Sequence, residues 1–211
     1  GKTTFITRGA EIAFSRGMIL VNSAGNEGND SVWPYINAPA DGPSVLTVGA
    51  VNTAGTIASF SSYGPTFDGR IKPDVCAQGQ GTSLINSAGN VGSGNGTSFS
   101  SPVLTGVVAC LWQAFPYATA AEVKGAIEWS AHLYEKPDSL MGYGIPDMEK
   151  ASFFLMNLSS IFYAMPLRPS IPFPSCLSLY LAFTAGCWYT CITKIRRILL
   201  YVRPVSLRCQ R

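Results

Sequence analysis

The chain has 211 residues, of which 47% are apolar and only 13% are charged. A chain of this length can bury one hydrophobic core, and its charged fraction lies well below the roughly 25% that is usual for soluble domains. No basic patch interleaved with aromatic residues occurs in the first 151 residues, so we do not expect nucleic-acid binding. The cysteine spacings do not match a zinc site and only one histidine, His132, is present, so no metal or other cofactor is expected from composition.

The charge balance changes abruptly near residue 151. Residues 1–151 hold 8 basic and all 12 acidic residues, which gives −4, and the other 7 basic residues give residues 152–211 a charge of +7. Four of the six cysteines also lie after residue 151. We therefore expect two parts of different origin or role, a folded part over 1–151 and a hydrophobic tail rich in Cys and Pro over 152–211.

Three explanations of the tail remain open. Residues 175–193 carry no charge and are followed by Lys194, Arg196 and Arg197, the pattern of a membrane anchor with a positive flank. The complete lack of acidic residues, with scattered Cys and Pro, instead favours a non-native or frameshifted tail, and an ordered extension is the third reading. We favour the non-native tail and do not expect a membrane partner. Residues 1–17 show no apolar core of a signal peptide.

The first half of the chain alternates between helix, strand and loop patterns. Thr3 or Thr4 can cap a helix over residues 5–16 that ends at Gly17. Apolar runs at 18–21 and 44–51 predict buried parallel strands. Residues 52–97 are mostly Gly, Ser, Asn and Thr, with short strand-like pieces at 58–60 and 74–77.

The second half begins with a nearly all-apolar stretch over residues 98–115, which predicts a helix buried on all sides. Pro116 ends it, and a capping box from Thr119 to Glu122 opens a second, amphipathic helix. The alternation predicts an α/β fold with a mostly parallel sheet. Cys76 and Cys110 are expected to be small buried residues rather than a disulfide.

The most specific motif is GTSFSSP at residues 96–102. It places Ser98 at the start of an apolar helix, where unpaired backbone N–H groups and the helix dipole favour negative charge. A serine hydroxyl needs a base and oxyanion donors before it becomes an effective nucleophile. An isolated GTS sequence would be read as a simple N-cap, but the longer motif before an apolar helix favours a catalytic serine.

This motif resembles the nucleophile motif of the subtilisin-like serine proteases, the subtilases. The segment VNSAGNEG at 21–28 is similar to the family segment whose Asn completes the oxyanion hole, which implies that role for Asn26. The resemblance also implies that Ser23, Ala24 and Gly25 form one wall of the substrate pocket. Three further segments are similar to the family and occur in the family's order within residues 4–151: ASFSSYGP at 58–65, KPDVCAQG at 72–79 and GYGIPD at 142–147. In the second of these, Gln78 stands in place of the usual proline. Ala38-Pro39 matches a turn proline of the family that is often cis.

The resemblance implies the C-terminal portion of a three-layer, subtilisin-like catalytic domain. The family's Asp-(Ser/Thr)-Gly and His-Gly-Thr segments do not occur in the sequence, and His132 lies after Ser98 at the end of a predicted helix, where we expect a surface or packing role. The opposite substrate-binding strand and the family's main calcium loop are also lacking, although the family allows calcium as a cofactor.

We therefore expect a serine endopeptidase that forms an acyl-enzyme on Ser98, present as an incomplete fragment that is inactive alone. The expected partners are a polypeptide substrate and the missing N-terminal part of the same catalytic domain. A non-catalytic binding or scaffold module is the alternative, and a protein whose membrane-anchored tail is the functional part is a third. An extracytoplasmic or secreted location is what the family resemblance implies.

Overall fold

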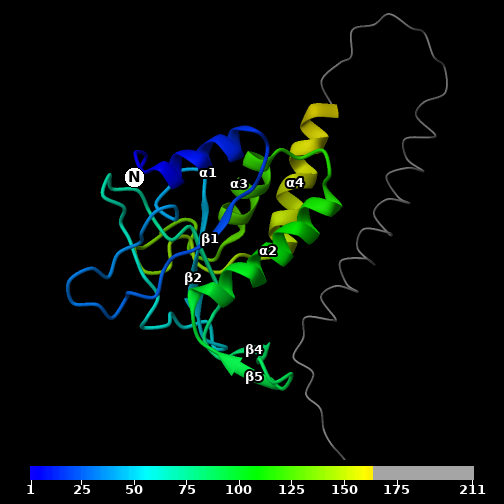
Figure 1. Ribbon diagram of the computed structural model, residues 1–211. Helices are drawn as coiled ribbons and strands as arrows, with labels where there is room; N and C mark the ends of the chain where they lie inside the picture. Colours follow the sequence, from blue (N-terminus) through cyan, green and yellow to red (C-terminus); the bar gives the residue numbers. More distant parts are fainter. Residues whose placement is uncertain (164–211) are drawn as a thin grey trace, which may run out of the picture. The chain divides into compact units, whose positions relative to one another are not determined.

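The computed structural model describes residues 1–163 of the chain, with side chains through residue 158, and these residues form one compact unit, Gly1–Tyr163. Most of the expected tail therefore lies outside the described residues. The described elements, shown in Figure 1, are α1 (Phe5–Ser15), β1 (Val21–Ser23), β2 (Leu46–Val51), β3 (Val75–Gln78), β4 (Thr82–Ile85), β5 (Val91–Gly94), α2 (Thr97–Ala114), α3 (Ala120–Ser130) and α4 (Met148–Tyr163).

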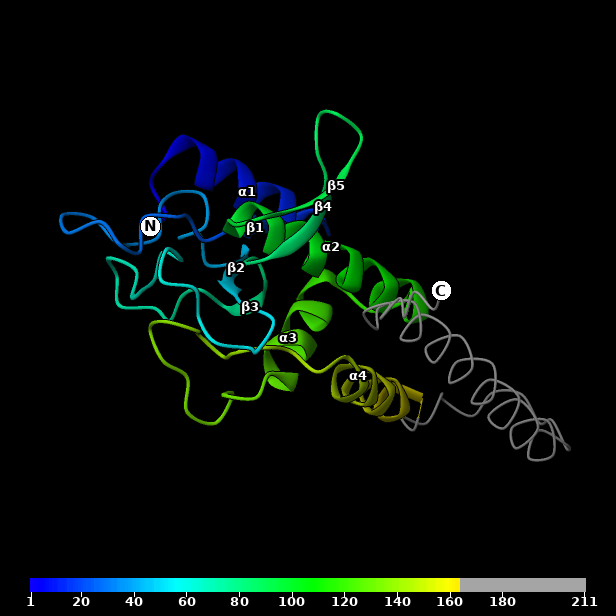
Figure 2. The same cartoon turned by 90° about the horizontal axis from the view of Figure 1, so that it is seen from below.

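A parallel three-stranded sheet lies at the centre, in the order β1-β2-β3. Val21 pairs with Leu46, and Val48 pairs with Val75. All six residues of β2 are buried, as expected for the central strand of a parallel sheet. α2 packs against all three strands, and α3 packs against α4 (Figures 1 and 2). The predicted α/β fold with a mostly parallel sheet is confirmed.

Two helices begin where the sequence predicts. Thr4 caps α1 by accepting a hydrogen bond from the Thr7 N–H at 3.3 Å. Thr119 and Glu122 form a reciprocal capping box at the start of α3, in which the Glu122 carboxylate accepts from the Thr119 N–H at 2.7 Å. Local hydrogen bonding of this kind satisfies the free N–H groups of a first turn, which is why the signal is readable from sequence.

The prediction that α2 is buried on all sides is wrong for the described residues. Its buried face consists of Thr97, Ser100, Leu104, Val108 and Leu111. The opposite face is exposed: Val103 is 42% accessible, and Cys110, expected to be buried, is also exposed. The helix is apolar on both faces, but within residues 1–163 the sheet covers only one of them.

Three strand predictions need correction. β1 begins at Val21, later than the predicted run 18–21, and Met18 is 57% exposed. Residues 58–60 form no strand, and only an isolated bridge joins Val51 to Ile57 there. The hairpin of β4 and β5, which projects from the body in Figure 1, was not predicted, because its short strands, TSLI and VGSG, lack the alternating apolar pattern that marks a strand.

The expected division after residue 151 falls inside α4 and is placed too early. Ala151 and Leu155 are buried in the main core, because one side of α4 packs on α3. The compact unit therefore continues to Tyr163. None of the helices in the described part of the chain is both long and apolar enough to cross a membrane.

Four charged side chains form a buried cluster beside the start of β3. The Lys72 ammonium donates to Asp74 Oδ2 at 2.5 Å, to the Val45 carbonyl at 2.6 Å and to Thr47 Oγ1 at 3.1 Å. Lys124 Nζ lies 3.5 Å from Asp74 Oδ1 and also pairs with Glu128. Burial lowers the pKa of Lys72 and raises that of Glu128, and the opposite charges in the cluster partly offset both effects.

Replacing Lys72 by Met should destabilise the fold by about 3–5 kcal/mol, because it leaves the buried Asp74 carboxylate without its nearest counter-charge. Urea unfolding followed by circular dichroism measures the change. The exposed Lys136 offers a matched control, and Lys136→Met should cost less than about 0.5 kcal/mol. Equal losses for the two variants would show that the cluster contributes nothing specific.

The two described cysteines should differ strongly in reactivity. Burial raises the pKa of the Cys76 thiol from 9.0 to about 12, so at pH 8 it holds far less of the reactive thiolate than an ordinary thiol. Iodoacetamide at pH 8 should modify the exposed Cys110 at least about 100-fold faster than Cys76, with rates converging in guanidinium. Peptide mass spectrometry separates the two sites, and equal native rates would contradict the burial.

The raised pKa of Cys76 also determines how the stability of the fold changes with pH. The pKa of the folded thiol lies above that of the unfolded one, so its stabilising contribution is complete below about pH 9. It is lost as pH rises from 9 toward 12. Cys76→Ala should therefore lose less stability than the wild type between pH 8 and 10.5, as measured by denaturation midpoints, and parallel losses would contradict this.

Candidate active site

Ser98 lies in the first turn of α2 and is exposed. Gly96 precedes the helix with φ +154° and ψ 148°, a conformation that only glycine adopts readily. Neither the Ser98 hydroxyl nor its backbone N–H has a hydrogen-bond partner among the described residues. The first turn of the helix therefore presents a nucleophilic oxygen and a free N–H donor at the same place.

Asn26 follows β1 and meets the start of α2. Its Oδ1 accepts two hydrogen bonds from Thr97, from the backbone N–H at 2.9 Å and from the hydroxyl at 3.0 Å. These two donors identify which side-chain atom is oxygen. Nδ2 has no partner in the described part of the chain, and a Cβ built on Gly96 would lie 3.7 Å from it. The structure thus brings Asn26 together with the turn that carries Ser98.

The expected pocket-wall residues lie directly before Asn26. Ala24 is buried and packs with Ile36 and Ala40, whereas Ser23 and Gly25 are half-buried. The peptide bond between Ala38 and Pro39, in the same packed segment, is cis, as the resemblance implied. The wall is thereby supported from behind by the loop that leads into β2.

A hydrogen-bonded brace that the sequence analysis missed holds this loop. Ser62 donates its N–H to the Gly25 carbonyl at 2.9 Å, and its hydroxyl accepts from the Glu27 N–H at 3.0 Å and donates to Glu27 Oε2 at 2.8 Å. A Cβ on Gly25, where φ is +116°, would lie 2.4 Å from that carboxylate. The only sequence signal for this brace is that both segments resemble the family, because their pairing spans 35 residues.

The turn after β3 completes the support beneath Ser98. Gly79 accepts a hydrogen bond from the Gly96 N–H at 2.8 Å, and its own N–H donates to the Val51 carbonyl. A Cβ on Gly79 would lie 2.8 Å from the Gly96 oxygen, so this close approach needs glycine. Gln78, which departs from the family pattern, ends β3, and its Nε2 donates to the Gly81 carbonyl at 3.3 Å.

His132 is exposed in the turn after α3. Its Nδ1 accepts a hydrogen bond from the Ile145 N–H at 2.9 Å, and a Cβ on Gly144 would lie 2.6 Å from the imidazole. Within residues 1–158 no hydrogen bond joins His132 to Ser98. The structure therefore brings together Asn26, Ser98 and the 23–25 segment, but it does not bring His132 to them.

Replacing Gly96 by Ala should destabilise the fold by about 1–3 kcal/mol, because the positive φ of +154° at this position is strained for any residue with a Cβ. Gly106 is the matched control, since it lies in the interior of α2 with open space around it. Gly106→Ala should stabilise by about 0.5–1 kcal/mol. Chemical denaturation of both variants tests the prediction, and a neutral Gly96→Ala would contradict it.

Comparison with known proteins agrees with this geometry. The model of the subtilase family (Peptidase_S8) matches residues 4–144, more than half of the chain. The serine protease AprX of Bacillus subtilis is 33% identical over 168 residues, which cover 69% of this chain and 38% of AprX. Subtilisin of Bacillus pumilus is 34% identical over 140 residues, which cover 66% of this chain and 48% of that protein. The chain thus spans less than half the length of these two relatives.

Solved structures show the same fold. The self-cleaved protease domain of PatA aligns with a TM-score of 0.60 at 23% identity, over 73% of this chain and 56% of that one. The prenylagaramide maturation protease PagA aligns with a TM-score of 0.58 at 24% identity, over 70% and 54%. Together with the parallel sheet, these matches confirm the predicted subtilisin-like fold. The chain belongs to the subtilase family of serine proteases.

Proposed function

We propose that this chain supplies the nucleophile and the oxyanion donors of a serine endopeptidase that acts on polypeptides. The observation that carries the proposal is the Asn26 amide, whose Oδ1 is held by Thr97 while Nδ2 stays free beside the turn that bears Ser98. The amide oxygen is held in place and the amide N–H₂ group is free to donate, next to an exposed serine at a helix N-terminus. This arrangement is a preorganised oxyanion site.

In this mechanism Ser98 Oγ attacks the carbonyl carbon of the substrate and loses its proton to a base. The negative oxygen of the tetrahedral intermediate accepts hydrogen bonds from the Ser98 N–H and Asn26 Nδ2. The C–N bond then breaks, the amine leaves with the transferred proton, and an acyl-enzyme forms on Ser98. Water hydrolyses this ester by the reverse sequence. Ser23, Ala24 and Gly25 form one wall for the substrate residue before the cleaved bond.

We infer that the base is supplied by a segment other than this chain. His132 is the sole histidine of the chain and bonds to Ile145 instead of Ser98. Without a base the serine stays protonated, and turnover should fall by roughly 10⁶, the loss known for subtilisin when its serine or histidine is removed. We therefore propose that a second segment contributes the Asp and His of the triad and that residues 1–211 alone are inactive.

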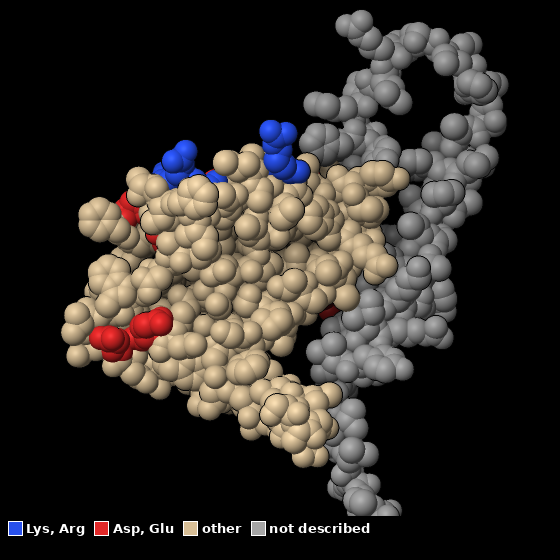
Figure 3. Space-filling model, viewed as in Figure 1, with Lys and Arg blue, Asp and Glu red and all other residues tan. Residues whose placement is uncertain are grey.

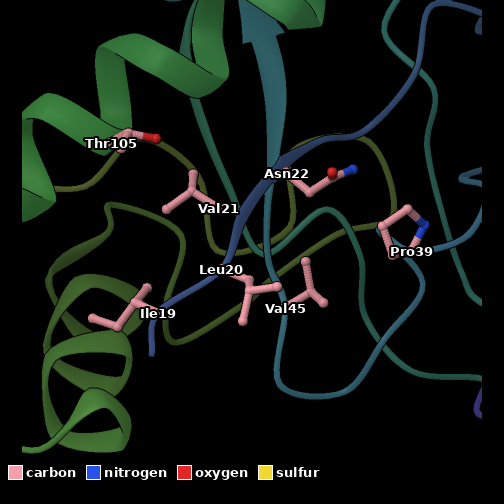
Figure 4. Close-up of a pocket in the computed structure, with 7 residues that line it drawn as sticks. All are labelled: Ile19, Leu20, Val21, Asn22, Pro39, Val45 and Thr105. Carbon is pink, nitrogen blue, oxygen red and sulfur yellow. The ribbon is translucent and has the colours of Figure 1, made fainter. Parts of the chain in front are cut away.

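The open edge of β1 is where we place this second segment. The Leu20 carbonyl and the Ala24 N–H bond toward β2, so, by alternation along the strand, Val21 and Ser23 direct their backbone groups to the other side. A groove of about 310 Å³ adjoins β1 (Figure 4), and its lining consists of Ile19, Leu20, Val21, Asn22, Pro39, Val45 and Thr105. An unpaired edge beside an apolar groove suits an added parallel strand.

α2 borders this groove through Thr105 and is exposed over a broad outer face. α2 contains no charged residue, and the face of the molecule over which it runs is almost free of charge (Figure 3). Val103 and Cys110 are exposed on it. An uncharged helix face next to an open sheet edge is unusual for a free surface and suits burial by the same second segment. The extracytoplasmic location implied by the family remains a prediction.

A chimera tests the proposal. The N-terminal catalytic segment of Bacillus pumilus subtilisin, joined before Gly1 of the full chain, should hydrolyse a peptide substrate and react with a fluorophosphonate probe. Ser98→Ala should abolish both, and Asn26→Ala should lower kcat by about 10²–10³, the loss known for the oxyanion amide of subtilisin. The chain without the added segment should neither hydrolyse the peptide nor react with the probe.

Two outcomes would overturn parts of this proposal. A chimera that melts cooperatively but neither hydrolyses peptides nor labels would favour the alternative, a non-catalytic binding or scaffold module. Hydrolysis by residues 1–211 alone that disappears in Ser98→Ala would instead show that no second segment is needed.

A further inference from the structure

Three aromatic side chains form a ladder on the loop that follows Asn26 and on the segment beside it. Trp33 contacts Tyr35, and Tyr35 contacts Tyr63, both edge to face, with ring centroids 5.5 Å and 5.7 Å apart. Trp33 is 52% accessible and Tyr35 39%. Residues 27–37 project from the body as a loop (Figures 1 and 2). The aromatic ladder (Trp33, Tyr35 and Tyr63) therefore offers exposed ring surface to a partner.

The backbone joins the aromatic ladder to the pocket wall. The Tyr63 N–H donates to the Pro34 carbonyl at 3.2 Å, and the Tyr63 carbonyl accepts from the Ile36 N–H at 3.1 Å. Tyr63 directly follows Ser62, whose N–H donates to the Gly25 carbonyl at 2.9 Å. The segment that holds the wall residue Gly25 therefore also holds the ladder, and the two surfaces are continuous.

Asp30 places a negative charge next to the aromatic ladder. Its Oδ1 accepts from the Val32 N–H at 2.7 Å and from the Trp33 N–H at 3.1 Å. These hydrogen bonds, first that from Val32, lower the pKa of the Asp30 carboxyl, so it is ionised at neutral pH. Oδ2 has no partner in the part of the chain whose side chains are described. Trp33 Nε1 donates to Asn37 Oδ1 at 2.9 Å, which fixes the indole ring beside this free oxygen.

The charge around the aromatic ladder is entirely negative. Residues 17–69 contain no lysine, arginine or histidine. Their four acidic residues are Glu27, Asp30, Asp41 and Asp68. Asp68 pairs with Arg70, whereas Asp30 has no ion-pair partner within residues 1–158. Figure 3 shows acidic side chains and no basic ones over this loop. A guanidinium group stacks on aromatic rings and pairs with a carboxylate through two parallel hydrogen bonds, so arginine complements this surface best.

We propose that the aromatic ladder and Asp30 bind an arginine of the polypeptide substrate, at a position outside the cleaved bond. The guanidinium lies against the rings of Trp33 and Tyr35 and donates to Asp30 Oδ2. The partner is a substrate because the ladder continues the pocket wall, and this part of the inference rests on the proposed endopeptidase function. Exposed contacts of this kind are individually weak, so the surface lowers KM for such substrates and leaves kcat nearly unchanged.

A binding test uses residues 1–211 and needs no activity. The indole N–H signal of Trp33 in the NMR spectrum should shift on titration with a blocked tetra-arginine peptide. A tetra-citrulline peptide, which has nearly the same shape without the charge, should bind at least about fivefold more weakly. Raising sodium chloride to about 0.5 M should remove most of this difference, because the ions screen the exposed carboxylate.

Variants locate the binding on this surface. Asp30→Asn removes the charge but keeps the oxygen that accepts the two backbone N–H groups, and it should weaken tetra-arginine binding about threefold. Tyr35→Leu should weaken binding about two- to fivefold. Glu135→Gln and Tyr117→Leu are the matched controls, since both side chains are exposed elsewhere, and each should change binding less than about 1.5-fold. Equal binding of the two peptides, variants no weaker than the controls, or binding of maltohexaose in place of the peptides would overturn the proposal.

An activity test uses the chimera and a set of peptides that share one cleaved bond. A single arginine is moved along the residues before and after that bond, and citrulline replaces it in a parallel set. At one or more positions arginine should lower KM about three- to fivefold relative to citrulline, with kcat within about twofold. Asp30→Asn should abolish this difference in KM, whereas Glu135→Gln should keep it. A KM that is the same for arginine and citrulline at every position would overturn the assignment to substrate.

The two tests separate this proposal from the endopeptidase function. An inactive chimera would count against the function, while tetra-arginine binding that Asp30→Asn weakens would still support the arginine surface. An active chimera that neither binds tetra-arginine nor prefers arginine at any position would leave the function standing and remove the surface.

Discussion

The complete burial of β2 is the constraint on which the described structure depends. All six of its residues are buried, it pairs with β1 on one side and β3 on the other, and α2 covers it. Because the strands are parallel, the chain leaves β1 and β3 at the same edge of the sheet. The loop with Asn26 and the turn with Gly79 therefore arrive at the place where Gly96 and Ser98 begin α2. The site follows from the direction of the strands.

The two edges of this sheet are treated differently. The edge of β3 is covered, since Tyr143 donates its N–H to the Asp74 carbonyl and the Gly144 carbonyl accepts from Cys76. β1 has no such cover within residues 1–163, and its residues are only half-buried. Open sheet edges invite added strands. The groove beside β1 therefore lies at the edge of the sheet that no other part of residues 1–163 covers.

The sequence predicted the elements whose signals are local. Thr4 and Thr119 cap the expected helices, and the apolar run at 44–51 is a central strand, because capping and burial leave their mark within a few residues. The hairpin before α2 was missed, since neither of its four-residue strands, TSLI and VGSG, shows a repeating apolar pattern. The exposed face of α2 was missed for another reason: composition reports that a face is apolar, not whether a partner covers it.

The candidate site was predictable only as far as its motifs extend. Ser98 and Asn26 were found by resemblance to a family, and the geometry then supplied what motifs do not contain. The brace between Ser62 and Glu27 and the contacts of Thr97 with Gly25 and Asn26 join residues 35 to 72 positions apart. Pairings over such distances depend on topology, so no spacing in a single sequence indicates them.

The buried charged residues lie away from the candidate site, at the other end of β3. The buried cluster of Lys72, Asp74, Lys124 and Glu128 lies where β3 begins, at the opposite end of the strand from Gly79. At the other end, the groups that face the proposed oxyanion are a backbone N–H and an amide, which carry no charge at any ordinary pH. Such donors hold their orientation without a charge to be neutralised or solvated. Proton transfer is the one step that this arrangement cannot supply, and it is the step that we assign to the segment docking on β1.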